Sequence, residues 1–368
     1  MQADGRGLIQ TSTAALRGRK LFCWGTAAGG RHWQEWLCGP GSRYLEIQAG
    51  LATTQLEHLR LGAGAEISWA EAYAPIDGAP GAEVHGSWPD AIAEVAELVA
   101  RTVSEGELDE WHRWWRAEVA EKVPQQLTAG AGAGEAELAV RGEDPDGLPG
   151  TPFGQPLADG FGHLVALART GGVDQDAVGT NVLVPPISDR WGAALNRASA
   201  GWWGQLMTAI RAHAREDLEQ ARLGYERSDQ LRSTPWAARG LALLAGSQGD
   251  HPRAADLYAR AVAQAPTCLP LLVEATDQLL ASGRPAACLT MIDAAPDHIA
   301  VHGRLVLQRA RALLADGRAD AARALLEAGI EVPDLREGET LGALWRAAFG
   351  DRPLPYHLDF RMRPELDH

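Results

Sequence analysis

The feature that most constrains the fold is a 34-residue period in the C-terminal part of the chain. Gly249, Gly283 and Gly317 recur at this interval, each in a short polar turn between Ala- and Leu-rich stretches. A period of this length is typical of stacked helix pairs, because no single pair can bury its apolar side without the next. The period therefore predicts an α-solenoid over residues 201–330.

Two further positions follow the same spacing and indicate the type of repeat. A small residue follows each turn glycine after five positions and a bulky one after nine, which suits helices that approach closely around one wedged side chain. An earlier copy of the repeat has the same small and bulky residue types, 33 residues before Ala254 and Tyr258. The arrangement resembles the tetratricopeptide repeat. The small positions are Ala254, Cys288 and Ala322, the bulky ones are Tyr258, Ile292 and Leu326, and the earlier copy has Ala221 and Tyr225.

Prolines agree with this interpretation at the helix starts. Pro252 and Pro285 closely follow their turn glycines, where a second helix would begin. The third copy is the weakest, because Pro296 interrupts it early. The first helix of each pair is expected to line a groove that binds a protein or peptide. Arg239 and Gln308 are candidate contact residues there, and no clamp of basic residues is evident.

Charge and composition restrict the possible partners. The 368-residue chain has a net charge of −14 and a pI near 5.3. Such a chain repels nucleic-acid phosphates and anionic lipid, so neither nucleic acid nor a membrane is expected as a partner. No apolar run approaches the ~20 residues that span a bilayer, and residues 1–20 lack the apolar core of a secretion signal. The four cysteines form no C-x-x-C pair, which favours a cytoplasmic protein with reduced thiols, without metal or cofactor.

The zone from 86 to 200 mixes helical and irregular segments. Ile92, Val95 and Val99 recur at helical spacing within residues 87–123, which predicts one or two amphipathic helices. The later glycine- and proline-rich stretches, 128–137 and 142–156, are interpreted as a flexible joint and a long loop.

A C-terminal tail, residues 331–368, follows the repeats. Its segment 340–350, TLGALWRAAFG, is apolar on one side. The last pair of a solenoid exposes an apolar face that needs a cover. The segment is therefore expected to cap the repeats.

The first zone, residues 1–85, predicts antiparallel β structure. Its short apolar or alternating segments are separated by glycine-rich links. The segment RYLEIQAGL alternates cleanly, with Tyr44, Glu46 and Gln48 on one face and Leu45, Ile47 and Ala49 on the other. The fold class expected for the whole chain is α+β: an N-terminal antiparallel β segment, a helical linker region and a C-terminal α-solenoid.

A family resemblance concerns residues 17–76. The motifs KLFCWG, GGRHWQEWL, YLEIQAGLATTQLEHL and SWAEAYAPI cover this range densely. The range resembles the C-terminal part of a bacterial domain of unknown function, which has a galactose-mutarotase-like β-supersandwich and is followed by tetratricopeptide repeats. STPWAARGLALLA and LDFRM resemble that family more loosely. The resemblance implies a carbohydrate-related role, with residues 1–85 as the last part of the β domain.

The sequence departs from the resembling family in length. The β domain of that family runs to some hundreds of residues, and most of it precedes the motifs quoted above. The present sequence begins near the last part of that domain. A truncated product or a fragment of a longer gene is therefore expected, in which a site needing the earlier strands would be incomplete.

Glu46 is the candidate catalytic acid. It lies mid-strand between Tyr44 and Gln48 on one face, where a carboxylate beside an aromatic ring and an amide can act as an acid/base or hold sugar hydroxyls. Alternation by itself favours a different interpretation, in which these residues form a solvent-facing polar stripe. When the family resemblance is added, the catalytic and the solvent-facing interpretations are about equally supported. A carboxylate pair for glycoside hydrolysis would combine Glu46 with Glu35, Glu57 or Glu71.

Further candidates for substrate binding precede and follow this strand. Arg31, Trp33 and Glu35 share one face if their segment is extended, and such groups grip hydroxyls or stack on a sugar. The alternative is a loop rim with one buried Trp. Gln55, near the end of the expected strand, is a further polar candidate beside His58.

Two functions remain open at this point. The first is a repeat-based interaction scaffold with a carbohydrate-binding β segment, which holds a protein or peptide in its groove and a saccharide at the β segment. The second is a carbohydrate-active enzyme, an epimerase or glycosidase, with Glu46 as acid/base. No phosphate-binding loop, nucleophile elbow or zinc-protease motif is present.

Overall fold

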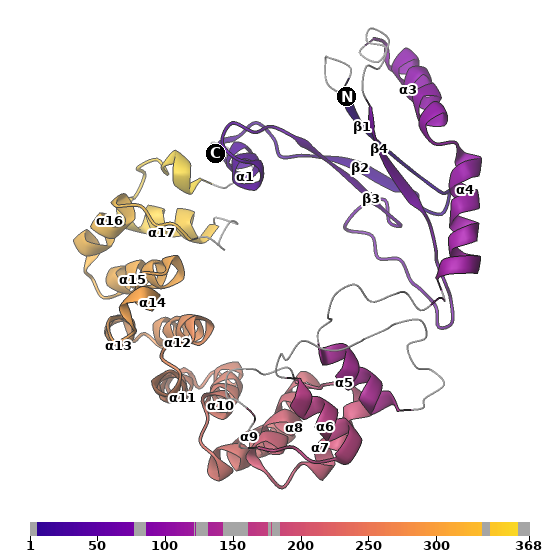
Figure 1. Cartoon of the computed structure of the whole chain (residues 1–368). Coiled ribbons are helices and arrows are strands. Elements are labelled where there is room, and N and C mark those ends of the chain that lie inside the picture. The colour runs from indigo at the N-terminus through magenta and orange to yellow at the C-terminus, as the bar shows by residue number, and fades with distance from the viewer. Residues whose placement is uncertain are drawn as a thin grey trace. The chain divides into compact units, whose positions relative to one another are not determined.

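A computed structural model describes most of the chain and shows a mainly helical protein with a small antiparallel β segment near the N-terminus (Figure 1). The chain divides into two compact units, one formed mainly by residues 1–124 and the other by most of 125–361. The expected zone 86–200 is therefore shared between them. The described residues are 6–76, 86–120, 122, 132–142, 161–175, 178, 185–332 and 339–359.

Two antiparallel strand pairs form the β part of the first unit. Strand β1 pairs with β4, and β2 pairs with β3 in a register that sets Phe22 opposite Glu46. The antiparallel segment is thus confirmed, including the strands expected in KLFCWG and RYLEIQAGL. The bounds are β1 Gly7–Ser12, β2 Gly18–Cys23, β3 Leu45–Gly50 and β4 Glu71–Ile76.

The segment GGRHWQEWL is a helix, and the extended conformation considered for it is wrong. Helix α1 spans Ala28–Cys38 and ends at Gly39, whose φ of 96° suits glycine alone. The segment has neither proline nor β-branched residues, and its two glycines lie in the first turn of the helix. A Cβ on Gly30 would lie 1.9 Å from the Trp24 carbonyl oxygen, so the helix packs on the end of β2 only because this position is glycine.

Two helices follow the β strands in the first unit, as the apolar spacing predicted. Helix α3 spans Trp88–Thr102 and α4 spans Glu105–Trp114, continuing into a π-helical turn η1 at Trp115–Val119. Ser104 separates them because its hydroxyl and the Glu107 carboxylate form a reciprocal capping box.

The second unit begins with shorter helices that pack on the first repeat. Trp191 and Leu195 share a buried cluster with Trp203 and Leu206 of the repeat. The expected joint at 128–137 is wrong from residue 132 onward, since α5 begins there, and the expected loop 142–156 lies outside the described residues apart from Gly142. The bounds are α5 Gly132–Arg141, α6 Gly162–Thr170, η2 Asp189–Trp191 and α7 Gly192–Arg197.

Four helix pairs form the solenoid, in agreement with the 34-residue period. All eight repeat positions predicted to lie inside are buried, from Ala221 to Leu326. The two helices of each pair pack on each other, and each pair packs on the next. The pairs are α8 Trp202–Ala214 with α9 Leu218–Leu231, α10 Pro235–Ser247 with α11 His251–Gln264, α12 Leu269–Ala281 with α13 Pro285–Asp293, and α15 Gly303–Ala315 with α16 Ala319–Glu327.

The third repeat, interrupted at Pro296, and the capping helix also lie where the sequence predicted them. A short helix α14, Asp297–Ala300, follows Pro296 and separates the third pair from the fourth. Helix α17, Glu339–Phe349, buries Trp345 in a cluster with Leu307 and Leu326 of the last pair. A 3-10 turn η3, Tyr356–Leu358, ends the described chain. None of the helices in these ranges has the length and apolarity needed to span a bilayer.

Candidate functional site

The β3 strand places three predicted residues on one half-buried face. Tyr44, Glu46 and Gln48 are partly covered, whereas Leu45 and Ile47 on the opposite face are exposed. The polar stripe is thus the more covered face, opposite to the usual arrangement of an antiparallel sheet. Glu46 accepts a hydrogen bond of 2.8 Å from the Gln48 amide, so carboxylate and amide form one polar group on the strand.

A group of aromatic rings lies beside this face. The Trp24 ring stacks on Trp33 of α1 with ring centroids 5.5 Å apart, and lies 6.2 Å from the Tyr44 ring. Phe22, opposite Glu46, contacts Trp24 edge-on at 4.9 Å. The structure therefore brings Trp33 and Tyr44 together through Trp24, a residue that the strand pattern did not single out.

The other predicted substrate-binding residues lie elsewhere. In α1, Arg31 and Glu35 are one turn apart while Trp33 faces away from both, so the three do not share a face. Glu35 forms an ion pair of 3.2 Å with Arg43. Gln55 lies in an exposed turn after β3 has ended, so it is not at a strand end as expected.

The carboxylates considered as partners of Glu46 have other contacts. Glu57 accepts a hydrogen bond of 2.7 Å from the Thr53 amide, and Glu71 lies on the other strand pair. Within the described ranges, no cluster of three or more His, Cys, Asp or Glu side chains could hold a metal ion.

Two neighbouring hollows lie along the first helices of the solenoid, at the face where a groove was expected. The first, of about 530 Å³, lies between α8 and α10, and the second, of about 620 Å³, lies between α10, α12 and α15. Leu243 lines both. The first also has Ile210, His213, Tyr225, Trp236 and Arg239, and the second has Tyr258, Glu274, Asp277 and Arg311.

A polar network joins the walls of these hollows. Arg239 of α10 donates two hydrogen bonds of 2.7 Å to Glu274 of α12. The Tyr258 hydroxyl donates to the same carboxylate at 3.2 Å. Asp277 and Arg311 form a second ion pair, of 2.6 Å, one repeat further on. The groove thus carries charges of both signs, and these charges pair with each other.

The aromatic wall of the first hollow is neutral at physiological pH. Burial raises the pKa of Tyr225 to about 12 and lowers the pKa of His213. The two side chains lie 3.3 Å apart between Nδ1 and the hydroxyl. Neutral rings beside Trp236 make this hollow suitable for apolar groups.

Sequence reasoning identified one groove residue correctly and missed others. Arg239 lines the first hollow, whereas the Gln308 side chain is buried and accepts a hydrogen bond from Arg311. The pairing of Asp277 with Arg311 had a visible signal, because opposite charges recur 34 residues apart. The Arg239–Glu274 pair is offset by one residue from that period, and no such signal marks it.

Comparison with known proteins identifies the fold. No protein-family model matches the chain, and no curated protein matches it. Among solved structures it is similar to a TPR-domain containing protein from Parabacteroides distasonis ATCC 8503, with a TM-score of 0.53 and 18% identity. The fold is of the tetratricopeptide type. The match covers 96% of this chain and 55% of the other, so this chain spans about half the length of that protein. The similarity supports the repeat fold and leaves the galactose-mutarotase-like resemblance as a prediction.

Proposed function

We propose that the protein is an interaction scaffold whose solenoid groove binds a segment of another protein. The observation that carries this proposal is the pair of hollows on the first-helix face, joined at Leu243. Repeat solenoids bind partners along such faces, and a protein segment is long enough to occupy both hollows.

The lining of the hollows defines what such a segment needs. The first hollow offers the Trp236 and Tyr225 rings with Ile210, so it takes an apolar side chain. The charges of the two hollows already pair with each other, Arg239 of the first hollow with Glu274 of the second, and Asp277 with Arg311 within the second. The segment is therefore expected to be close to neutral, with one apolar anchor and polar groups beside it.

The test uses a random 12-residue peptide display library as the probe for the full chain. Ala214 and Ala281 are exposed residues that line the first and second hollows, so Ala214→Arg and Ala281→Arg fill these spaces without removing core contacts. Ala324→Arg on exposed α16 is the matched control. We expect selected peptides to bind at least tenfold more weakly to the two groove variants and equally to the control. Equal binding to all four proteins would place the peptides outside the groove and refute the proposal.

A second proposal concerns the β segment. We infer a saccharide-binding patch there, supported by the Glu46–Gln48 hydrogen bond beside the stacked Trp24 and Trp33 rings. Rings of this kind stack on sugar faces, and carboxylates and amides hold hydroxyls. The test is tryptophan fluorescence titrated with a panel of mono- and oligosaccharides, in the wild type and in Trp33→Leu. A flat response across the panel would argue against the patch.

The enzymatic alternative, an epimerase or glycosidase using Glu46, is proposed from the same patch. Glu46→Gln preserves the side-chain shape and removes the acid. We expect this change to abolish turnover of any sugar that the protein converts, measured by NMR of the anomeric protons. Unchanged turnover would exclude Glu46 as the acid/base.

A further inference from the structure

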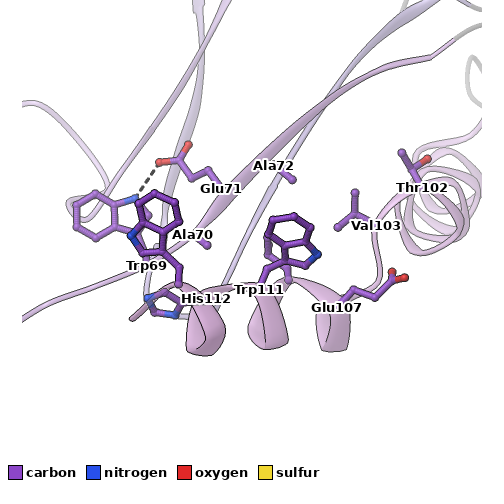
Figure 2. A pocket seen from close by; sticks show the side chains of 11 residues that line it. Trp69, Ala70, Glu71, Ala72, Thr102, Val103, Glu107, Trp111 and His112 are labelled. Atoms are coloured by element: carbon purple, nitrogen blue, oxygen red, sulfur yellow. Dashed lines mark hydrogen bonds between the residues drawn. The ribbon is translucent and has the colours of Figure 1, made fainter. Parts of the chain in front are cut away.

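A tryptophan-lined pocket of about 590 Å³ lies in the first unit, away from the predicted strand face (Figure 2). One wall is residues 69–72, at the start of β4, and the other is one face of α4 and its π-helical turn, with residues 102–103 beside it. We call it the tryptophan pocket. Its lining includes Trp69, Glu71, Glu107, Trp111, His112 and Trp115.

Local structure explains why the α4 residues face one space. Glu107, Trp111 and Trp115 follow each other at intervals of four, so they lie along one face of the helix. The π-helical turn begins at Trp115, and such turns occur frequently at functional sites. Arg116 forms an ion pair with Glu66, which connects this end of the helix to the segment before β4.

The rings of the pocket are unusually open to solvent. The exposed fractions are 40% for Trp69, 67% for Trp111 and 54% for Trp115. Exposed apolar surface of this extent on neighbouring residues marks interaction sites in soluble proteins. The solvent exposure of these rings is thus the first observation that indicates a ligand-binding site.

The charge of the pocket is negative. Two carboxylates, Glu71 and Glu107, line it, and among its described lining residues there is neither Lys nor Arg. Glu71 accepts hydrogen bonds from the Tyr73 hydroxyl at 2.7 Å and the Trp69 indole at 2.9 Å. Gln10 adds a third, of 3.3 Å. These donors, the Tyr73 hydroxyl first, hold the pKa of Glu71 below its usual value, so it is ionised at neutral pH.

Hydrogen-bonding capacity decides between a sugar and a cation. A polyol needs several free donors and acceptors, and the Glu71 carboxylate, the Trp69 indole and the Thr102 hydroxyl already have partners. Glu71 has three donors, Glu107 accepts from Ser104, and the Thr102 hydroxyl donates to Leu98. Among the described lining side chains, only His112 has a buried polar atom, Nε2, that is left without a partner. A cation needs charge and ring faces rather than free hydrogen-bonding groups, and the pocket offers both.

We propose that the tryptophan pocket binds an organic cation of the alkylammonium class. Figure 2 shows the bond from Trp69 to Glu71 at one end and Glu107 at the other, with Trp111 between them. The cation lies against the Trp111 ring, and the two carboxylates provide the opposite charge. Two sources have this chemistry: a free quaternary ammonium solute and a methylated lysine side chain of a protein.

The experiment measures binding of tetramethylammonium to the full chain by ligand-observed NMR at constant ionic strength. Neopentyl alcohol, a neutral molecule of similar size, and methyl glucoside are the comparison ligands. Trp111→Leu and Glu71→Gln remove a ring and a charge. Trp88→Leu is the matched control, because Trp88 is even more exposed than Trp111, at 78%, but does not line the pocket.

We expect saturable binding of tetramethylammonium and at least fivefold weaker binding of neopentyl alcohol. Trp111→Leu and Glu71→Gln should each weaken cation binding at least fivefold, and Trp88→Leu should leave it unchanged. The proposal is overturned if the neutral alcohol or the glucoside binds as well as the cation. It is also overturned if no cation binding saturates, or if Trp111→Leu, an exposed change that keeps the fold, has no effect.

The two sources are separated by a second comparison. A short Gly/Ser peptide with one trimethyllysine is titrated beside free choline. A peptide that binds at least tenfold more tightly than choline indicates a protein side chain as the ligand, and equal affinities indicate a free solute. If neither the trimethyllysine peptide nor choline binds, and neopentyl alcohol does bind, the pocket is merely apolar and the proposal is wrong.

Discussion

Arg239 and Glu274 form a two-armed ion pair across the groove, with Nε–Oε2 and Nη2–Oε1 distances of 2.7 Å. They lie on the first helices of consecutive repeats, α10 and α12. Tyr258, from the second helix between them, donates to the same carboxylate. Three successive helices are thus joined by a network that links Arg239 of the first hollow to Glu274 and Tyr258 of the second.

Glu274→Gln is expected to lower the free energy of unfolding by about 1 kcal/mol, because it removes the charge from a bidentate pair. The effect stays small because both side chains are about a third exposed, at 37% and 35%, and solvent screens the pair. Urea unfolding measures it. Asp320→Asn, which removes an ion pair with a 99% exposed aspartate, is the control and should cost less than Glu274→Gln. Equal costs would contradict the special role of the groove pair.

Replacing each of two glycines in α10 by alanine should change the free energy of unfolding in opposite directions. A Cβ on Gly240 would lie 2.4 Å from the Tyr225 ring, so Gly240→Ala is expected to destabilise by about 1–3 kcal/mol through overpacking. A Cβ on Gly246 would meet the end of the flexible Gln278 side chain at 3.4 Å. Gly246→Ala should therefore stabilise by up to ~1 kcal/mol through helix propensity. Thermal unfolding of both variants tests the pair, and a stabilised Gly240→Ala protein would show that the helices can separate there without cost.

The turn of the first repeat lacks the glycine of the others. Glu216 has a φ of 63°, and it stands 33 residues before Gly249, whose φ is 78°. A side chain is unfavourable in this left-handed conformation, while glycine loses more entropy on folding. Glu216→Gly should thus stabilise by about 0.5–1 kcal/mol, and Gly249→Ala should destabilise by about 1 kcal/mol. Denaturant midpoints of the two variants should shift in opposite directions, and a destabilised Glu216→Gly would mean that the glutamate side chain makes a compensating contact.

The thiol of Cys288 should resist alkylation in the folded protein. It is fully buried, and desolvation raises its pKa to about 11. Because the thiolate is the reactive form, iodoacetamide at pH 8 should modify exposed Cys23 and Cys38 and leave Cys288 unmodified. Mass spectrometry of the peptides measures each site, and labelling in urea is the control in which Cys288 should react. Labelling of folded Cys288 at the rate of Cys23 would indicate that the third repeat opens.

The β segment shows where sequence reasoning reached its limit. Alternation located β3 and the two faces of the strand correctly, because the side-chain period of a strand is a local property. The stretch around Trp33 was considered as extended, and it is a helix. Its conformation depends on Gly30, which lets α1 approach the Trp24 carbonyl, and on Gln34, whose amide donates to the Gly30 carbonyl and accepts from the Tyr44 amide. Such contacts exist only once the strands are in place.

The sequence by itself determined the solenoid. A spacing of 34 residues and the small residues at Ala254, Cys288 and Ala322 are properties of the chain, and helices that approach closely accept only small side chains there. The tertiary structure decided which polar groups meet. Arg239 reaches Glu274, and Glu71 lies beside the α4 tryptophans, because the rotation of each helix about its axis is set by the packing of all its neighbours. That rotation is not written in any one segment, so the groove network and the tryptophan pocket became visible only in the folded chain.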